Sequence, residues 1–188
     1  MSKHIVDCPY CGSKAEYRLG TSSKGELNFN DPKEQFYVCS NYPKCDTYVR
    51  ADIHGKKRGS LANRELRRLR MMAHYLFDQL WLDGLMTRTQ AYNFLWKSMG
   101  LPKKRSHIGE MNEENCRTLV RMMQKKEVWF LNIKKNCDSF KVFYLKLNDI
   151  FYCFKIDSDK CRSFLKKKPE EVVFYCIQNR WKCELERA

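Results

Sequence analysis

Two pairs of closely spaced cysteines constrain this chain more than any other feature. Cys8 and Cys11 lie in Cys8-Pro-Tyr-Cys-Gly12, and Cys39 and Cys45 lie in Cys39-Ser-Asn-Tyr-Pro-Lys-Cys45. Four thiolates with this spacing fit one tetrahedral zinc site. Gly12 permits a positive φ directly after Cys11, so that the first pair can turn back on itself. The alternatives are four ordinary buried cysteines or two disulfides, but Pro and Gly within the turns favour a single Zn²⁺ held by all four side chains.

Residues 5–50, which hold both cysteine pairs, resemble the four-cysteine zinc ribbons at the C-terminus of type IA DNA topoisomerases. In those ribbons a CPxCG knuckle precedes a C-S-N-Y-P-x-C knuckle, which stands here as Cys39 to Cys45. The resemblance implies zinc binding and contact with single-stranded nucleic acid. The insert between the knuckles, residues 13–38, is longer here than those ribbons usually carry.

The insert between the two cysteine pairs predicts a β-hairpin. Residues 15–19 and residues 35–38 alternate in the manner of strands. Residues 20–34 are rich in Gly, Ser, Asn and Asp, and we expect an exposed loop there. Because such a small module buries too little surface to fold alone, we expect metal binding and folding to be coupled.

Cysteine usage favours a reducing compartment. The chain of 188 residues has ten cysteines, of which six are scattered singly among apolar residues, and we expect no leader segment before the first pair. We therefore expect a cytoplasmic protein, in a bacterium or a phage-infected host cell, rather than a secreted disulfide scaffold. No apolar run reaches the roughly 18 residues of a membrane-spanning helix, so we expect no membrane partner.

Positive charge is concentrated in the middle of the chain. The formal net charge is +14, and residues 51–126 carry 16 Lys and Arg against 7 Asp and Glu. The connector at residues 51–60 holds three consecutive cations, Lys56, Lys57 and Arg58. This composition suits a phosphate backbone, and it is equally typical of a solvated linker. A basic region beside a zinc ribbon favours a polyanionic partner, with a merely solubilising surface as the alternative.

Three helices are expected in this basic region. The first, residues 61–82, has an apolar stripe at steps of three and four residues, and Ser60 is its expected N-cap. The second, residues 87–100, opens with a Thr-x-x-Gln capping box. The third follows Asn112 as its N-cap and has two glutamates in its first turn.

A second line of side chains runs beside the apolar stripe of the first helix. It consists of Arg67, Arg70, His74, Asp78 and Trp81. His74 and Asp78 are one turn apart, so that the carboxylate can orient the imidazole. We favour a buried polar network, because partly buried charges are usually paired. The alternatives are a phosphate site formed by the arginines and a metal or general-base site.

Several spaced motifs lie between His54 and about Met123. They are Gly59-Ser-Leu-Ala-Asn-Arg-Glu-Leu-Arg-Arg-Leu-Arg70, then Ala73-His74, Phe77-Asp78, Trp81, Tyr92, Leu95, His107-Ile-Gly109 and Cys116. Together with the ribbon, these motifs resemble a zinc-finger-containing domain family of bacteria and their phages whose function is undefined. The resemblance covers about two thirds of the chain. It implies that the ribbon and the three helices form one unit, and it supplies no reaction.

The last third of the chain has aromatic and β-branched runs that are typical of strands. The expected strands are residues 128–133, 140–147, 150–156, 172–177 and 181–185, with a turn at Asn148-Asp149 and a short helix at residues 161–168. The cysteines of this region form no second knuckle, and we expect free thiols at Cys137, Cys153, Cys161, Cys176 and Cys183.

The expected fold class is therefore α+β. A zinc ribbon (residues 1–50) packs with a basic three-helix domain (residues 51–126), and a small antiparallel sheet with a short helix (residues 127–188) follows.

The leading functional hypothesis is a nucleic-acid-binding protein with one structural Zn²⁺. Contacts to nucleic acid are expected from Tyr42 and from nine cations: Lys56, Lys57, Arg58, Arg64, Arg67, Arg68, Lys103, Lys104 and Arg105. The role of the polar residues Arg70, His74, Asp78 and His107 is left open. No Gly-rich phosphate loop, G-x-S-x-G or H-E-x-x-H motif is present, which disfavours an enzyme.

Two other functions remain as alternatives. The phage-associated family and the lysine-rich last third suggest an inhibitor of a host defence complex, of the CRISPR type or another nuclease. Its partner would be a host protein or a ribonucleoprotein. The second alternative is a metal-dependent nuclease that uses His74, Asp78 and His107.

Overall fold

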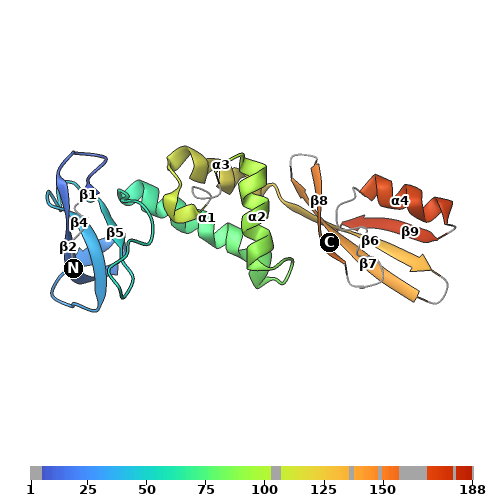
Figure 1. Ribbon diagram of the computed structural model, residues 1–188, viewed down its shortest axis with the longest axis horizontal. Coiled ribbons are helices and arrows are strands. Elements are labelled where there is room, and N and C mark those ends of the chain that lie inside the picture. The colour runs from blue at the N-terminus through green and yellow to red at the C-terminus, as the bar shows by residue number, and fades with distance from the viewer. Residues whose placement is uncertain are drawn as a thin grey trace. The chain divides into compact units, whose positions relative to one another are not determined.

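The computed structural model describes residues 6–102, 107–135, 138–147, 150–156, 169–179 and 181–187. These residues contain four α-helices and two antiparallel sheets (Figure 1), which confirms the α+β class. The chain forms two compact units. The first comprises residues 1–75 and 96–118, and the second comprises residues 76–95 and 119–188. The predicted domain limits at residues 50 and 126 stay a prediction.

The N-terminal sheet is built around one long strand. β2 (Lys14–Ser23) pairs antiparallel with β1 (Val6–Asp7), β3 (Glu26–Asn28) and β4 (Glu34–Cys39), and β4 pairs with β5 (Tyr48–Arg50). The two strands predicted between the cysteine pairs are confirmed. Their register sets Tyr17 opposite Tyr37 and Ala15 opposite Cys39, so that β4 ends beside the segment that carries the first cysteine pair.

The predicted loop at residues 20–34 is wrong in part. β2 continues to Ser23 and forms a two-residue hairpin with β3 through Lys24 and Gly25. Both turn residues have positive φ, of 51° and 84°, which matches the right-handed twist of the flanking strands. The pair Lys-Gly lacks the Asn or Asp that usually marks this turn, and the hairpin was therefore missed.

The N-terminal sheet has a small apolar cluster on each face. One cluster consists of Ala15, Tyr37, Val49, Ala51 and Leu61. The other consists of Phe36, Val38 and Tyr48. Neighbouring residues of β4 enter opposite clusters because side chains alternate along a strand. The apolar surface of this sheet is thus divided between two faces, and neither face has a large core.

The three predicted helices are confirmed as α1 (Arg64–Leu82), α2 (Arg88–Met99) and α3 (Glu113–Gln124), with a short 3-10 helix, η2 (Ile108–Glu110), before α3. Ser60 as the N-cap of α1 is wrong. Asn63 caps this helix, because its Oδ1 accepts a hydrogen bond from the Leu66 backbone N–H at 2.9 Å. Among the described residues, no helix combines the length and the apolar character that a membrane crossing requires.

The predicted caps of the other two helices are confirmed. Thr87 and Gln90 form a reciprocal capping box, in which the Gln90 N–H donates to Thr87 Oγ1 at 3.2 Å and the Thr87 N–H donates to Gln90 Oε1 at 2.7 Å. Asn112 accepts a hydrogen bond from the Asn115 N–H at 2.9 Å. Local sequence signals therefore determine where α2 and α3 begin.

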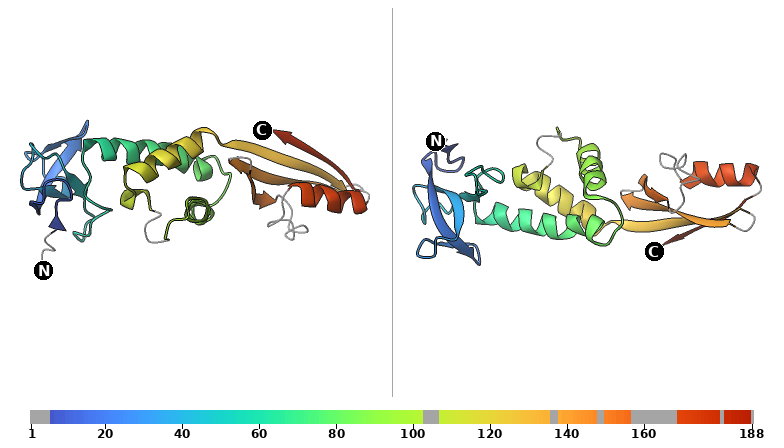
Figure 2. Two further views of the ribbon diagram at one scale, coloured as in Figure 1. Left: turned by 90° about the horizontal axis from the view of Figure 1, so that it is seen from above. Right: turned by 60° about the horizontal axis from the view of Figure 1, so that its bottom comes forward.

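The C-terminal sheet has the strand order β8-β7-β6-β9. Its strands are β6 (Glu127–Lys135), β7 (Asp138–Leu147), β8 (Ile150–Ile156) and β9 (Lys182–Arg187). α4 (Pro169–Gln178) lies beside this sheet (Figure 2). Seven buried residues form its core: Leu131, Ile133, Phe140, Val142, Tyr144, Val172 and Cys176.

The strand predicted at residues 172–177 is wrong, because this run lies within α4. Val172 and Cys176 are one helical turn apart and are both fully buried in the C-terminal core. Pro169 occupies the first position of the helix, where proline is well tolerated. The helix predicted at residues 161–168 and the turn at residues 148–149 lie outside the described residues.

Candidate metal centre and basic surface

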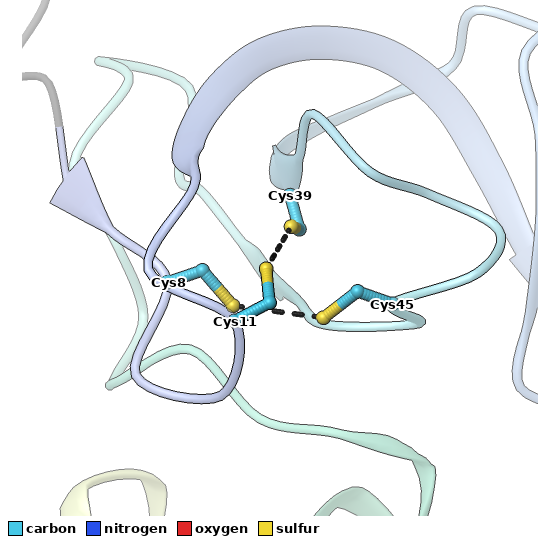
Figure 3. A group of neighbouring side chains, drawn as sticks. All are labelled: Cys8, Cys11, Cys39 and Cys45. Carbon is cyan, nitrogen blue, oxygen red and sulfur yellow. Dashed lines mark hydrogen bonds between the residues drawn. The ribbon is translucent and has the colours of Figure 1, made fainter.

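The four paired cysteines converge on one point in the first unit (Figure 3). The sulfur atoms of Cys8, Cys11, Cys39 and Cys45 all lie within 4.8 Å of one another. Cys8 Sγ is 3.7 Å from Cys45 Sγ, and Cys11 Sγ is 3.4 Å from Cys39 Sγ. A tetrahedron with metal–sulfur bonds of about 2.3 Å has sulfur–sulfur edges of about 3.8 Å. The cluster therefore has nearly the size of a tetrahedral four-thiolate metal site.

Backbone hydrogen bonds shape both knuckles. In the first, the Gly12 N–H donates to Cys8 O at 2.9 Å, and the Cys8 N–H donates to Ser13 O at 2.7 Å. Gly12 has the predicted positive φ, 74°, which a side chain would strain. In the second knuckle the Cys45 N–H donates to the carbonyl of Asn41 at 3.0 Å. Each turn thereby directs its two sulfurs toward the same point.

The four thiols have unequal environments. Cys8 and Cys39 are buried, Cys45 is half-buried and Cys11 is exposed. Burial raises the pKa of Cys39 to about 12 and also raises the pKa of Cys45. The backbone N–H and the hydroxyl of Ser13 lower the pKa of Cys11 to about 6. A cation at the centre favours the thiolate form of all four, so metal binding would be accompanied by proton release.

Three polar residues that sequence reasoning missed surround the cluster. Asn41 Nδ2 donates to Cys11 Sγ at 3.7 Å and to Ser13 Oγ at 2.9 Å. Thr47 is fully buried, and its Oγ1 lies 3.3 Å from Cys45 Sγ. Such contacts orient metal ligands and offset their charge. The signal that could have found these residues is their position, because each lies within two residues of a cysteine ligand.

The other described cysteines do not extend this centre. Cys153, Cys176 and Cys183 are free thiols, as predicted, while Cys137 and Cys161 lie outside the described residues. Burial raises the pKa of Cys116, although the neighbouring Arg70 opposes that effect, so that this thiol lacks the thiolate character of a nucleophile. In the described part of the chain, no second group of three or more His, Cys, Asp or Glu side chains comes together.

Arg70, from the line of polar residues on α1, is buried between two backbone segments. Its Nε and Nη2 donate to Met111 O at 3.1 and 2.7 Å, and its Nη1 donates to Ser60 O at 2.8 Å. The side chain is only 9% exposed. Arg70 therefore joins the connector to the segment after η2. His74 and Asp78 are both half-buried on α1, and His107 is exposed at the start of η2.

Arg67 is also held by the protein. Its guanidinium donates to the carbonyls of Ala62 and Gly25, pairs with Asp46 at 3.4 Å, and lies 3.7 Å over the ring of Tyr48. These contacts favour a structural role for Arg67. Its role as a phosphate ligand stays a prediction, and so does that of Arg64, which is exposed and pairs with Glu26 at 3.2 Å.

The connector is a folded loop rather than an extended linker. Asp52 Oδ1 accepts hydrogen bonds from the backbone N–H groups of Lys56 and His54, at 2.9 and 3.0 Å, and the Lys56 contact lowers the pKa of the Asp52 carboxyl. The loop leaves Lys56 and Arg58 exposed, while Lys57 is half-buried. Its shape is thus set by its own backbone, with two cations on the surface.

The remaining predicted contact residues have mixed placements. Arg68 on α1 is exposed. Tyr42 is half-buried, since its hydroxyl accepts a hydrogen bond from the Leu27 N–H at 3.2 Å and its ring meets that of Phe29 edge-on. A further aromatic residue, Tyr10 in the first knuckle, is 44% exposed. Lys103, Lys104 and Arg105 lie outside the described residues.

A family model described as a zinc-finger-containing domain matches residues 4–126. The match spans all four clustered cysteines, the connector and the helices α1 to α3, and it confirms the family resemblance seen in the sequence. No curated protein and no solved structure matches the chain.

Proposed function

Because the chain belongs to the family of zinc-finger-containing domains, we propose that it binds one structural Zn²⁺ and uses its ribbon and connector to bind nucleic acid. The observation that carries the zinc proposal is the convergence of four sulfurs at tetrahedral spacing. Thiolates are soft ligands that select Zn²⁺ over Mg²⁺ or Ca²⁺. Four protein ligands leave no open coordination position, so the ion would stabilise the fold rather than activate water.

The nucleic-acid proposal is supported by the placement of charge and aromatic surface. The excess of cations in residues 51–126 is in the matched family region. Lys56 and Arg58 on the connector and Arg68 on α1 are exposed, which suits contact with phosphates. Tyr10 exposes part of its ring in the first knuckle, where a base of a single strand could stack.

The proposal is tested with the full-length protein, purified with its metal. Elemental analysis should find one zinc per chain. A fluorescent single strand and a duplex are titrated by anisotropy at about 50 and about 200 mM salt, and we expect the affinity to fall steeply with salt. Absence of zinc contradicts the first half of the proposal. Absence of binding at low salt, or binding that is independent of salt, contradicts the second.

A matched pair of variants locates the contact. K56A/R58A removes two exposed cations of the connector, and we expect its log–log salt slope to fall by about two units. K134A/K182A removes the same charge from two exposed residues that face each other across β6 and β9. If both variants lose the same affinity, binding reflects net charge and not the connector. A complex with a host protein that survives nuclease treatment would instead favour an inhibitor.

A further inference from the structure

A cleft of about 230 Å³ lies in the first unit, between the N-terminal sheet, the connector and the first turns of α1. Its polar lining consists of Ser22, Tyr48, Arg50, Ser60, Arg67 and Arg70. Three of these six residues are arginines, and no carboxylate lines the cleft. The cleft is therefore strongly cationic for its size.

The charge of Arg70 is only partly balanced by the protein, because Glu110 attracts it without forming an ion pair. This side chain is buried, and its recorded hydrogen bonds run to neutral oxygens of Ser60 and Met111. Among the described residues no carboxylate lies within ion-pair distance of it. Burial accordingly lowers its pKa. Buried charges in proteins are normally paired, because an unpaired charge loses its hydration without compensation. An anion in the cleft would provide a closer partner than Glu110.

The other two arginines are partly neutralised by carboxylates that lie outside the lining. Arg67 pairs with Asp46 at 3.4 Å, and Arg50 pairs with Glu34 at 3.0 Å. Two of the three guanidinium groups thus have a carboxylate within ion-pair distance, while Arg70 feels Glu110 only without such a contact. The protein already holds Arg67 and Arg70 in place through backbone carbonyls, so that binding an anion requires little reordering of these side chains.

We propose that this cleft is a binding site for a phosphate group. Arg50 can offer its guanidinium to phosphate oxygens, whereas most N–H groups of Arg67 and Arg70 already donate to the protein, so that these two arginines act mainly through their charge. The Ser60 hydroxyl and one of the two mutually bonded hydroxyls of Ser22 and Tyr48 offer further donors. Pockets for drug-sized ligands usually have volumes of about 300 Å³ or more. The volume of this cleft is smaller and suits one phosphate with its adjoining sugar. The phosphate is supplied by a nucleic-acid strand, in which case the site rests on the proposed function, or by a small phosphorylated molecule.

Arg50 is the residue to vary, because Arg67 and Arg70 also hold the structure together. R50M removes the charge and keeps most of the aliphatic stem. Arg18 is a matched control, since it too lies on the N-terminal sheet, pairs with a carboxylate (Glu16, 2.8 Å) and covers an aromatic ring (Phe29). It does not line the cleft. E34Q is a third variant, which should leave Arg50 free to bind an anion.

The first measurement is an NMR titration of the full chain with inorganic phosphate, at ionic strength matched with chloride. We expect saturable shifts of the Ser22, Tyr48 and Ser60 amides. R50M should weaken this binding about tenfold or more, R18M should change it less than about twofold, and E34Q should strengthen it. Absence of saturable shifts in the wild type, or equal losses in R50M and R18M, overturns the proposal.

The second measurement distinguishes the two sources of phosphate. If a strand supplies the group, R50M lowers the salt slope of oligonucleotide binding by about one unit, and R18M does not. If R50M weakens phosphate binding but leaves oligonucleotide binding unchanged, the site takes a small phosphorylated molecule. If the wild type binds phosphate in the cleft but no oligonucleotide, the proposed nucleic-acid function fails and the phosphate site stands.

Discussion

The N-terminal sheet, β1 to β5, and the C-terminal sheet, β6 to β9, are both small and antiparallel, but their interiors differ. The N-terminal sheet divides its buried apolar residues into clusters of five and three, one on each face. The C-terminal sheet gathers five on one face, and two residues of α4 complete a single cluster of seven. Hydrophobic stabilisation scales with the apolar area that is removed from water. When the buried side chains are divided between two faces, the packing on each face therefore contributes less.

This difference shows what each region needs in order to fold. The C-terminal sheet has a core of its own, built from large side chains. The N-terminal sheet instead has four sulfurs in one cluster, and Arg67 of α1 donates to the carbonyl of Gly25 in the turn between β2 and β3. We infer that metal coordination and polar anchoring compensate for the small apolar clusters of the N-terminal sheet.

Removal of the metal should have the largest effect and should separate the two sheets. Structural Zn²⁺ contributes about 10 kcal/mol or more to the folding of small zinc modules. A strong chelator, or C39S, should therefore abolish amide-exchange protection in β2, β4 and β5. Protection in β6 and β7 should persist, and it serves as the internal control. Retained protection in β2, β4 and β5 would contradict the dependence of the ribbon on metal.

Shortening one core side chain of the C-terminal sheet should destabilise that sheet and leave the metal centre intact. Leu131 is fully buried among the seven core residues, and L131A should lower the free energy of unfolding of that region by about 2–5 kcal/mol. Zinc content should remain at one per chain. Urea unfolding followed by exchange of the β6 amides measures the first effect, and elemental analysis measures the second. Loss of zinc in L131A would show that the two regions are not independent.

A close backbone contact should make one glycine of the connector irreplaceable. Gly59 has a φ of 136°, and a Cβ there would lie 2.3 Å from Gly109 O. G59A should therefore destabilise the first unit by about 3 kcal/mol. Gly100, in the same unit, also has positive φ, but a Cβ would meet no atom within 4 Å. G100A should destabilise the unit by about 1 kcal/mol. Thermal unfolding measures both variants, and an equal loss of stability in G59A and G100A would refute the importance of the contact with Gly109.

Removal of the N-cap of α1 should have the smallest effect on stability. N63A removes the side-chain acceptor of the Leu66 N–H and should lower the free energy of unfolding by about 1 kcal/mol. N112A, which removes the equivalent acceptor at α3, is the matched comparison. Denaturant midpoints at constant slope would report both values. An unchanged free energy of unfolding in N63A would show that Asn63 is not the residue that caps α1.

Sequence signals succeeded where one local interaction decides the structure. The Thr87–Gln90 capping box, the Asn112 cap and the positive φ of Gly12 were all predicted and confirmed. They failed where two local conformations compete. Residues 172–177 are β-branched and aromatic, which favours a strand. In the structure Val172 and Cys176 share one helical face that packs in the C-terminal core, and this burial outweighs the propensity of the run.

The four candidate metal ligands were evident from the sequence, because ligand type and spacing within each pair are local properties. The placement of the arginines was not evident from the sequence. Helical periodicity sets Arg68 and Arg70 on different sides of α1, but it does not say which side is covered. Only the tertiary structure brings Ser60 and Met111 to Arg70, with Met111 lying 41 residues away in the sequence. Those backbone carbonyls bury Arg70 and leave Arg68 exposed. The carbonyls of Ser60 and Met111 come within reach of Arg70 only once the chain has folded. The cationic cleft therefore depends on the tertiary structure and not on the local sequence.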